Sequence, residues 1–325
     1  MGGPRSERGL TPGFDPQAVR DGLRDLEFSG LAVPSSAEQD YLAYYGIDFA
    51  NRIPGVVHHF GRLPAAGFDI ACHFYLPPRP RGTCLLVHGY FDHAGLYGKL
   101  SEYCLRHGYA VLAWDLPGHG LSSGLQASIE TFEHYVDVLG AVIARYGPQL
   151  PGPLFGIGQS TGGAILMAWA FRQRRLGLAC PFRRMMLLAP LVRPADWAKV
   201  RAMHTVLGPF RRSIARRFME NSGDTDFLAF LQRDPLQSTR LPLRWVSAMR
   251  RWLDAFMAET PNDYAPLVIQ GDQDTTVDWR WNLPRIRETF PAAEIRILQG
   301  ARHHLVNEGP ALRAQVFAAL GLVRD

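Results

Sequence analysis

The feature of this sequence that most limits its fold is a regular alternation of β-rich runs with stretches of helical periodicity. From Val56 onward, eight runs are typical of strands: residues 56–60, 68–75, 83–87, 110–114, 154–157, 185–189, 267–270 and 294–298. Helical patterns occupy residues 94–106, 131–145, 160–174, 279–289 and 310–319. Strands that alternate with helices build a mostly parallel sheet covered by helices on both faces. The sequence therefore predicts an α/β fold with an eight-stranded sheet, whose first two strands form an antiparallel hairpin at the edge.

The alternation stops at residues 193–261, which contain no convincing strand. Two apolar stripes with helical spacing occur there instead: Phe210, Ile214 and Phe218 form the first, and Trp245, Met249, Trp252 and Phe256 form the second. We therefore expect a helical cap at residues 193–261, inserted into a core formed by residues 51–192 and 262–325. Residues 1–50 are polar and mixed, with a helical patch near residues 17–28, and are expected to form an N-terminal extension.

Charge and cysteine content exclude several classes of protein. The formal net charge is +5, and the aromatic residues are not interleaved with the basic ones as in known nucleic-acid-binding motifs. The four cysteines are widely spaced and form no C-x-x-C pair, which is typical of free thiols in a reducing compartment. The N-terminus lacks a signal-peptide pattern, and no run of about 18 apolar residues occurs. These features predict a cytoplasmic protein that does not bind nucleic acid.

The stretch GIGQSTGG, residues 156–163, follows a predicted strand and allows two interpretations. Its glycines can let backbone amides hold a phosphate, or they can expose Ser160 as a nucleophile. The dinucleotide-binding fingerprint is incomplete because Thr161 replaces its third glycine, and no acidic residue that could bind a ribose occurs between Asp137 and Asp196. A Walker loop needs a lysine, which is missing here. The phosphate interpretations therefore lack residues that their chemistry requires.

The nucleophile interpretation requires G-x-S-x-G between a strand and a helix, and GQSTG at residues 158–162 satisfies it. The glycines are expected because side chains beside so tight a turn would collide. A serine hydroxyl needs a histidine to remove its proton and a carboxylate to orient that histidine. Asp274 and His303 follow the last two predicted strands, in the chain order serine, acid, histidine. This joint pattern favours a catalytic triad of Ser160, Asp274 and His303. Three neighbouring side chains are rival candidates: Asp272, Asp278 and His304.

Five segments support this interpretation together: HGYFDHAGLYG at 88–98, DLPGHGLSSG at 115–124, GQSTG at 158–162, GDQDTTVD at 271–278 and GARHHLVNE at 300–308. With these segments the chain resembles the α/β-hydrolase superfamily, and within it the monoglyceride lipases and bacterial lysophospholipases. The resemblance implies the α/β-hydrolase fold, and it selects Asp274 and His303 over their neighbours. It also implies that the backbone amides of Tyr90 and Thr161 form an oxyanion hole.

The resemblance is incomplete at two positions. Gln159 stands before the nucleophile where histidine is commoner in the family, and Arg302 precedes the predicted base. Related enzymes that open epoxides or remove halogens place aspartate at the elbow, so the serine here indicates acyl transfer. The expected reaction is ester hydrolysis through an acyl-enzyme on Ser160, which requires no metal and no organic cofactor.

The sequence of the predicted cap does not identify the substrate. Its second stripe, Trp245, Met249, Trp252 and Phe256, is expected either to line an acyl channel or to pack the cap onto the core. The segment PFRRSIARRF at residues 209–218 has the composition of a basic amphipathic helix, which is found both at anionic membranes and as an ordinary surface helix. We expect a lipid ester of the monoacylglycerol or lysophospholipid type as substrate. The alternatives are a small ester, thioester or peptide-like amide, or a non-catalytic ligand-binding relative of the fold.

Overall fold

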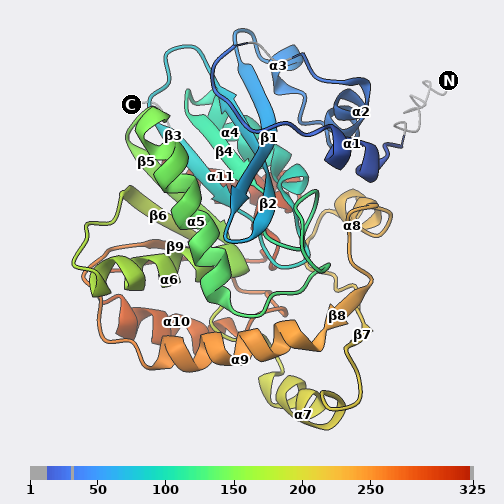
Figure 1. Cartoon of the computed structure of the whole chain (residues 1–325). Helices are drawn as coiled ribbons and strands as arrows, with labels where there is room; N and C mark the ends of the chain where they lie inside the picture. The colour runs from blue at the N-terminus through green and yellow to red at the C-terminus, as the bar shows by residue number, and fades with distance from the viewer. Residues whose placement is uncertain (1–12, 31–32, 323–325) are drawn as a thin grey trace, which may run out of the picture.

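The computed structural model describes residues 13–30 and 33–322, and at its centre is a sheet of eight strands (Figure 1). The order is β1-β2-β4-β3-β5-β6-β9-β10. The strands are β1 Val57–Ala65, β2 Phe68–Leu76, β3 Thr83–Val87, β4 Ala110–Trp114, β5 Leu154–Gln159, β6 Phe182–Leu188, β9 Leu267–Gly271 and β10 Glu294–Leu298. β2 is antiparallel to β1 and to β4, and the remaining neighbours are parallel. The mostly parallel sheet with an antiparallel edge hairpin is confirmed.

Helices cover both faces of the sheet and complete two hydrophobic cores. They are α4 Gly98–Arg106, α5 Phe132–Tyr146, α6 Thr161–Arg175, α10 Trp279–Thr289 and α11 Pro310–Leu320, with 3-10 turns η1 Ala94–Tyr97, η2 Gly147–Gln149 and η3 Leu305–Asn307. Along β3, Leu85 and Val87 pack in the core shared with α5, α6 and α10, whereas Cys84 and Leu86 pack in the core shared with α4 and α11. Successive side chains of a strand point to opposite faces. The central strand is therefore buried on both sides, as in other parallel sheets.

The described part of the predicted N-terminal extension contains three short helices, α1 Pro16–Gly22, α2 Ser36–Tyr45 and α3 Phe49–Arg52. α2 begins with a capping box, in which the side chains of Ser35 and Glu38 each accept a hydrogen bond from the other residue's amide. Tyr41 of α2 is fully buried and stacks on Phe60 of β1, with ring centroids 5.5 Å apart. The helix expected near residues 17–28 ends earlier, and α2 and α3 are additional to the prediction. This segment packs against the edge of the sheet.

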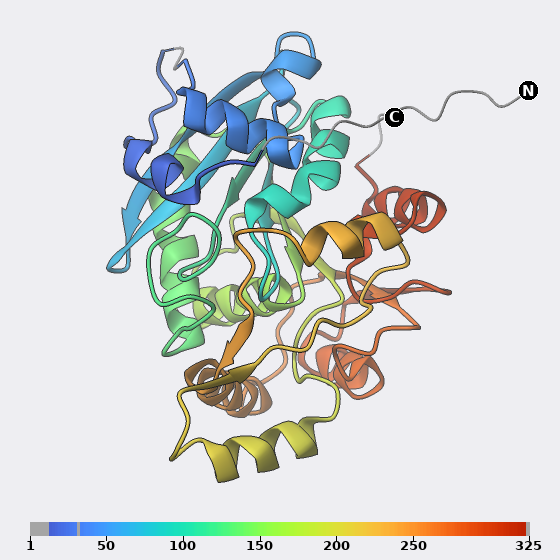
Figure 2. The same ribbon diagram turned by 90° about the vertical axis from the view of Figure 1, so that its right-hand side faces the viewer.

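The segment between β6 and β9 that was predicted to form the cap, residues 193–261, contains three helices and a small two-stranded sheet. Its elements are α7 Trp197–Leu207, β7 Ser213–Ala215, α8 Thr225–Leu231, β8 Arg240–Pro242 and α9 Leu243–Met257. β7 and β8 pair antiparallel. In both views α7 lies at the end of the molecule farthest from α3 (Figures 1 and 2). The cap is therefore mainly helical, as predicted, but it is not without strands.

The helix predicted from Phe210, Ile214 and Phe218 is wrong. Pro209 follows the end of α7, and Ile214 lies in β7, where it pairs with Leu241 of β8. A backbone that bonds to a neighbouring strand cannot also make helical hydrogen bonds. The four-residue spacing of these apolar side chains therefore does not reflect a helix, and the basic amphipathic helix expected over residues 209–218 is absent.

Within residues 13–30 and 33–322, no helix combines the length and the apolar character needed to cross a membrane.

Candidate active site

Ser160 lies at a sharp turn between β5 and α6. Its backbone angles are φ 52° and ψ −111°, a conformation that is strained for any residue with a side chain. The Ser160 amide donates to the carbonyl oxygen of Leu188 at 2.8 Å, which anchors the turn to β6. A Cβ atom on Gly158 would lie 2.4 Å from the Gly162 oxygen, and one on Gly162 would lie 2.0 Å from the Val87 oxygen. The steric reason for both glycines of G-x-S-x-G is confirmed.

The structure brings Asp274 and His303 into contact from the loops that follow β9 and β10. His303 Nδ1 lies 2.7 Å from Asp274 Oδ2, which also accepts a hydrogen bond from Gln270 Nε2 at 2.9 Å. The other carboxylate oxygen, Oδ1, accepts from the amides of Thr276 at 2.8 Å and Val277 at 3.1 Å. Four donors thus hold the carboxylate in one orientation, and the carboxylate in turn orients the imidazole ring.

The environment of this pair shifts both pKa values in directions that favour charge. Burial by itself raises the pKa of Asp274, but the adjacent His303 and the hydrogen bonds to the carboxylate outweigh burial and hold this pKa below its ordinary value. Burial lowers the pKa of His303, but the Asp274 carboxylate outweighs burial and raises this pKa above its ordinary value. An imidazole that takes up a proton readily is suited to act as a general base.

Ser160 and His303 line the same cavity, which has a volume of about 220 Å³ and lies between the strand-end loops and the cap. Its apolar wall comes mainly from the cap: Trp197, Val200, Leu241, Trp245, Val246 and Met249. Thr161, Tyr90 and Asp92 supply polar groups on the side of the sheet. Arg216, Arg217 and Asn221 of the predicted cap also line it. A mainly apolar cavity with polar groups in its wall is typical of a binding site for a small organic molecule.

Tyr90 and Thr161, the residues predicted to supply the oxyanion hole, both line this cavity. Thr161 is the first residue of α6, where the helix N-terminus carries partial positive charge. Across the part of the chain that the structure describes, neither backbone amide donates a hydrogen bond to a protein group. The Tyr90 ring is fixed by stacking on Trp245, with centroids 3.7 Å apart, and its hydroxyl donates to the Ala127 oxygen at 2.7 Å.

The second apolar stripe of the cap divides between two environments. Trp245 and Met249 line the cavity, so the acyl-channel interpretation remains a proposal for these two residues. Trp252 and Phe256 do not line it. Trp252 stacks on Phe132 of α5 with centroids 5.6 Å apart, and Phe256 packs in the same core as α5 and α6. The packing interpretation therefore applies to the C-terminal half of the stripe.

The rival candidates lie in other environments. His304 Nε2 lies 3.1 Å from Asp92 Oδ2, which also accepts a hydrogen bond from the hydroxyl of Tyr97 at 2.9 Å. Burial raises the pKa of Asp92, but the nearby His304 outweighs burial and holds this pKa far below its ordinary value. Asp272 is partly exposed and accepts from the amide of Gly300 at 2.8 Å. Asp278 forms an ion pair with Arg193 at 2.6 Å. Neither Asp272 nor Asp278 contacts His303.

Gln159, one of the two departures from the family pattern, connects the elbow to the His303 loop. Its Nε2 donates to the His303 carbonyl oxygen at 3.3 Å, and its Oε1 accepts from the Val306 amide at 3.5 Å. The sequence indicated that this position was unusual but did not indicate this bridge. The second departure, Arg302, donates from its backbone amide to the Glu308 carboxylate at 2.6 Å.

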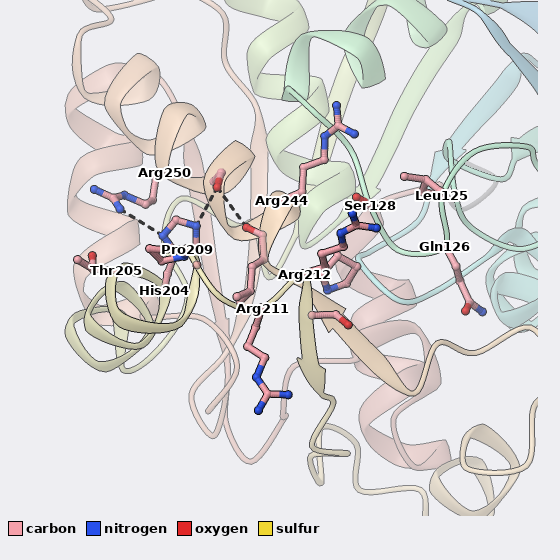
Figure 3. Close-up of a pocket in the computed structure, with 15 residues that line it drawn as sticks. Leu125, Gln126, Ser128, His204, Thr205, Pro209, Arg211, Arg212, Arg244 and Arg250 are labelled. Atoms are coloured by element: carbon pink, nitrogen blue, oxygen red, sulfur yellow. Dashed lines mark hydrogen bonds between the residues drawn. The ribbon is translucent and has the colours of Figure 1, made fainter.

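A second hollow, of about 910 Å³, lies along another side of α9 and contains none of the predicted site residues (Figure 3). Four arginines line it: Arg211, Arg212, Arg244 and Arg250. Figure 3 shows Arg250 against His204, where Nη1 and Nδ1 lie 3.3 Å apart. In this hollow His204 Nε2 lies 2.8 Å from Ser247 Oγ, but Ser247 lies inside α9 and its hydroxyl also donates to the Leu243 carbonyl oxygen at 3.2 Å. His204 Nδ1 faces Arg250 instead of a carboxylate, so this pair lacks the acid that orients His303, and the smaller cavity is the candidate active site.

Among residues 13–30 and 33–322, His, Cys, Asp and Glu side chains do not gather into a group of three that could hold a metal ion.

Comparison with known proteins finds a matching family model and related proteins. The model of the family described as "Serine aminopeptidase, S33" matches residues 78–310. The monoglyceride lipase homolog of Monkeypox virus is 26% identical over 255 residues, which cover 76% of this chain and 91% of the viral protein. The phospholipase YtpA of Bacillus subtilis is 24% identical over 205 residues, covering 62% of this chain and 78% of that protein. The crystal structure of a soluble variant of monoglyceride lipase from Saccharomyces cerevisiae covers 81% of this chain and 94% of its own, with a TM-score of 0.69 and 19% identity.

Proposed function

Because the chain belongs to the serine aminopeptidase S33 family of α/β-hydrolases, we propose that it hydrolyses carboxylic esters of single-chain lipids through an acyl-enzyme on Ser160. The observation that carries this proposal is that the strained Ser160 and His303, which is paired with Asp274, line one mainly apolar cavity. The relatives named monoglyceride lipase and phospholipase support a lipid ester as the substrate. The chain is a hydrolase, and what we propose is its substrate class and the residues that act on it.

In the proposed mechanism, His303 removes the proton from the Ser160 hydroxyl while the serine oxygen attacks the ester carbonyl carbon. The resulting tetrahedral intermediate collapses, the bond to the alcohol breaks, and His303 donates its proton to the departing alcohol oxygen. A water molecule then gives a proton to His303 and attacks the carbonyl carbon of the acyl-enzyme. The bond from that carbon to Ser160 Oγ breaks, His303 returns the proton to Oγ, and the fatty acid is released. Asp274 keeps the Nδ1 proton of His303 directed away from Ser160 and stabilises the imidazolium.

The backbone amides of Tyr90 and Thr161 are proposed to stabilise the negative oxygen of the intermediate. Their freedom from protein hydrogen bonds supports this role, because donors already used elsewhere in the protein could not bind the oxyanion. A donor of this kind contributes about 2.7–4 kcal/mol to transition-state binding. Backbone amides suit the task since they do not move when the charge develops.

Hydrolysis of a series of 1-acylglycerols with increasing chain length, compared between the wild type and Ser160→Ala, tests the proposal. We expect the wild type to prefer medium or long chains and the variant to lose activity on all of them. Ser247→Ala is a matched control, because Ser247 lies in the second hollow, where it bonds to His204 at 2.8 Å. Retention of ester hydrolysis by Ser160→Ala, or acceptance of only the shortest chains by the wild type, would contradict the proposal.

The description of the family model favours aminopeptidase activity as a second candidate. An aminopeptidase must bind the positively charged amino terminus of its substrate, which calls for an available carboxylate. Among the described residues that line the cavity, Asp92 is the only acidic one, and its Oδ2 already faces Tyr97 and His304. The electrostatics of the cavity therefore favour the ester over the peptide. Assay of amino-acid p-nitroanilides separates the two, since only an aminopeptidase would release nitroaniline.

Contact of the cap with an anionic membrane is also a proposal, although the helix on which it was based is absent. Phe210 is 82% exposed and stands beside Arg211 and Arg212, which line the second hollow. An exposed aromatic ring next to positive charge suits the boundary of an anionic bilayer. Sedimentation of the protein with anionic and neutral vesicles tests this contact. The cytoplasmic location expected from the four cysteines stays a prediction.

A further inference from the structure

Arg216 stands out because it brings a positive charge into the cavity of Ser160 and His303. It lies directly after β7, and its amide donates to the Thr239 oxygen at 2.9 Å, so its backbone is tied to the small sheet of the cap. The residue is half-buried. The sequence suggested a solvated arginine on a surface helix, whereas the structure places its side chain at the candidate active site.

Protein contacts hold the Arg216 guanidinium in place from two sides. Nη1 donates to Gln237 Oε1 at 2.6 Å and to the Ser238 carbonyl oxygen at 3.1 Å. The guanidinium carbon also lies 3.9 Å from the ring centroid of Phe91 and 4.4 Å from that of Phe218, which are cation–π distances. Phe91 itself has a positive φ of 68°, which is uncommon outside glycine. The side chain is therefore fixed before any substrate binds.

The charge of Arg216 is without a carboxylate partner among the described residues. Among residues 13–30 and 33–322, no carboxylate oxygen lies within the 4.0 Å limit of an ion pair with this guanidinium. Burial lowers the pKa of Arg216 to about 10, although the negative charges of Asp92 and Asp234 oppose this change. At neutral pH the side chain remains positively charged. Charge that is removed from water without an opposite charge is unfavourable, so a bound anion would be stabilised here.

The acidic groups near Arg216 are engaged with other partners. Asp92 Oδ2 accepts a hydrogen bond from Tyr97 and lies 3.1 Å from His304. Asp234 is buried and its Oδ2 lies 2.8 Å from His93 Nε2. Arg217, by contrast, also lines the cavity and adds a second positive charge there. The lining of the cavity therefore offers more free positive than negative charge to a ligand.

We propose that Arg216 binds the phosphate of the substrate's head group, so that the preferred substrate is a single-chain lipid ester with a phosphate-bearing head group. This inference depends on the proposed lipid-ester function and narrows it. A guanidinium can donate two parallel hydrogen bonds to a phosphate, whereas a neutral glycerol head group gains no charge complementarity from it. The ester carbonyl then lies at Ser160, the acyl chain follows the wall that includes Trp245 and Met249, and the head group points to Arg216.

The test compares 1-lauroylglycerol with 1-lauroylglycerol 3-phosphate, both as dispersed monomers so that membrane binding does not contribute. We expect Arg216→Gln to lower the ratio of kcat/KM for the phosphate lipid to kcat/KM for the neutral lipid about tenfold to hundredfold, mainly through KM. Arg216→Lys keeps the charge and should retain part of this ratio. Arg212→Gln removes the same charge from the second hollow and should leave the ratio unchanged.

A purely structural role for Arg216 gives a different result. If Arg216→Gln lowers kcat/KM for both lipids by the same factor, or if Arg212→Gln changes the ratio equally, the inference is wrong. Should Arg216→Gln fail to fold, the salt dependence of the wild-type ratio decides, because charge recognition weakens as salt rises; a ratio that is the same at about 50 mM and about 500 mM NaCl would exclude charge recognition. Wild-type enzyme that cleaves only the neutral lipid overturns the inference but leaves the proposed function intact. Wild-type enzyme that cleaves neither lipid overturns both.

Discussion

Replacement of Asp274 by asparagine is the sharpest test of the proposed proton transfer. Because Oδ1 of Asp274 accepts from the amides of Thr276 and Val277, the asparagine oxygen is expected to occupy that place. The asparagine NH₂ group then replaces Oδ2, 2.7 Å from Nδ1 of His303. A donor at this position can bond only to an unprotonated Nδ1. The imidazole is thereby forced to carry its proton on Nε2, where it cannot accept the proton of Ser160.

The expected loss in kcat is about 10⁴-fold, the size of effect that the corresponding substitution has in a serine protease. At 1.36 kcal/mol for each factor of ten, this corresponds to about 5 kcal/mol of transition-state stabilisation. The effect on folding should be smaller, since the asparagine oxygen keeps two of the four hydrogen bonds to Asp274. Loss of a charged hydrogen bond costs about 1.5–3 kcal/mol. Activity should therefore fall far more than stability.

The assay is the steady-state hydrolysis of a soluble p-nitrophenyl ester at pH 8, with circular dichroism to verify that the variant is folded. Asp272→Asn is the matched control, because Asp272 lies in the same loop and bonds to the Gly300 amide rather than to His303. We expect this control to keep nearly the wild-type kcat. If folded Asp274→Asn retains more than about a tenth of the wild-type kcat, a loss of under 1.4 kcal/mol, the tautomer argument is refuted.

Three further predictions follow from the same contacts. Only neutral His303 can act as a base, so kcat/KM should fall as the pH is lowered, with an apparent pKa above the ordinary histidine value of 6.5. A pH profile of kcat/KM with its midpoint below 6.5 would contradict this prediction. Gly162→Ala should lower the free energy of unfolding in urea by about 3 kcal/mol or prevent folding, because the new Cβ atom would lie 2.0 Å from a backbone oxygen. Gly22→Ala is the control and should leave this free energy nearly unchanged, because no atom lies within 4 Å of the new Cβ. Trp252→Ala should lower that free energy by about 3–5 kcal/mol without changing the preferred acyl length, whereas Trp245→Ala should change the preferred length. An unchanged preference in Trp245→Ala would contradict its place in the channel, and a changed preference in Trp252→Ala would contradict its purely packing role.

Much of the fold could be predicted from local patterns. The eight strands and five of the helices lie close to their expected residues, because β3, β4 and β9 are buried along their whole length and helical periodicity marks the segments between the strands. The candidate site was predictable for a related reason. Gly158 and Gly162 must be small wherever a strand turns this sharply into a helix, and strand ends of a parallel sheet gather at one edge. Asp274 and His303 therefore meet although 29 residues separate them.

The cap shows where such patterns fail. Helical spacing states which side chains share a face, but not what that face contacts, so Trp245 and Trp252 looked equivalent although one lines the cavity and the other packs on α5. At Ile214 even the element was wrong, because pairing with Leu241, 27 residues away, overrides the local pattern.

The sequence by itself determined the succession of strands and helices along the chain, because the period of burial differs between the two elements. It also determined the elbow around Ser160, through short-range sterics, and the placement of an acid and a histidine directly after strands. Only the tertiary structure decided which part of the cap stripe lines the cavity. It also decided that Arg216 enters the cavity with no ion-pair partner in the described part of the chain. These features depend on contacts between the cap and the strand-end loops, such as that between Arg216 and Phe91. No local pattern encodes them, because burial and charge pairing arise only when distant segments come together.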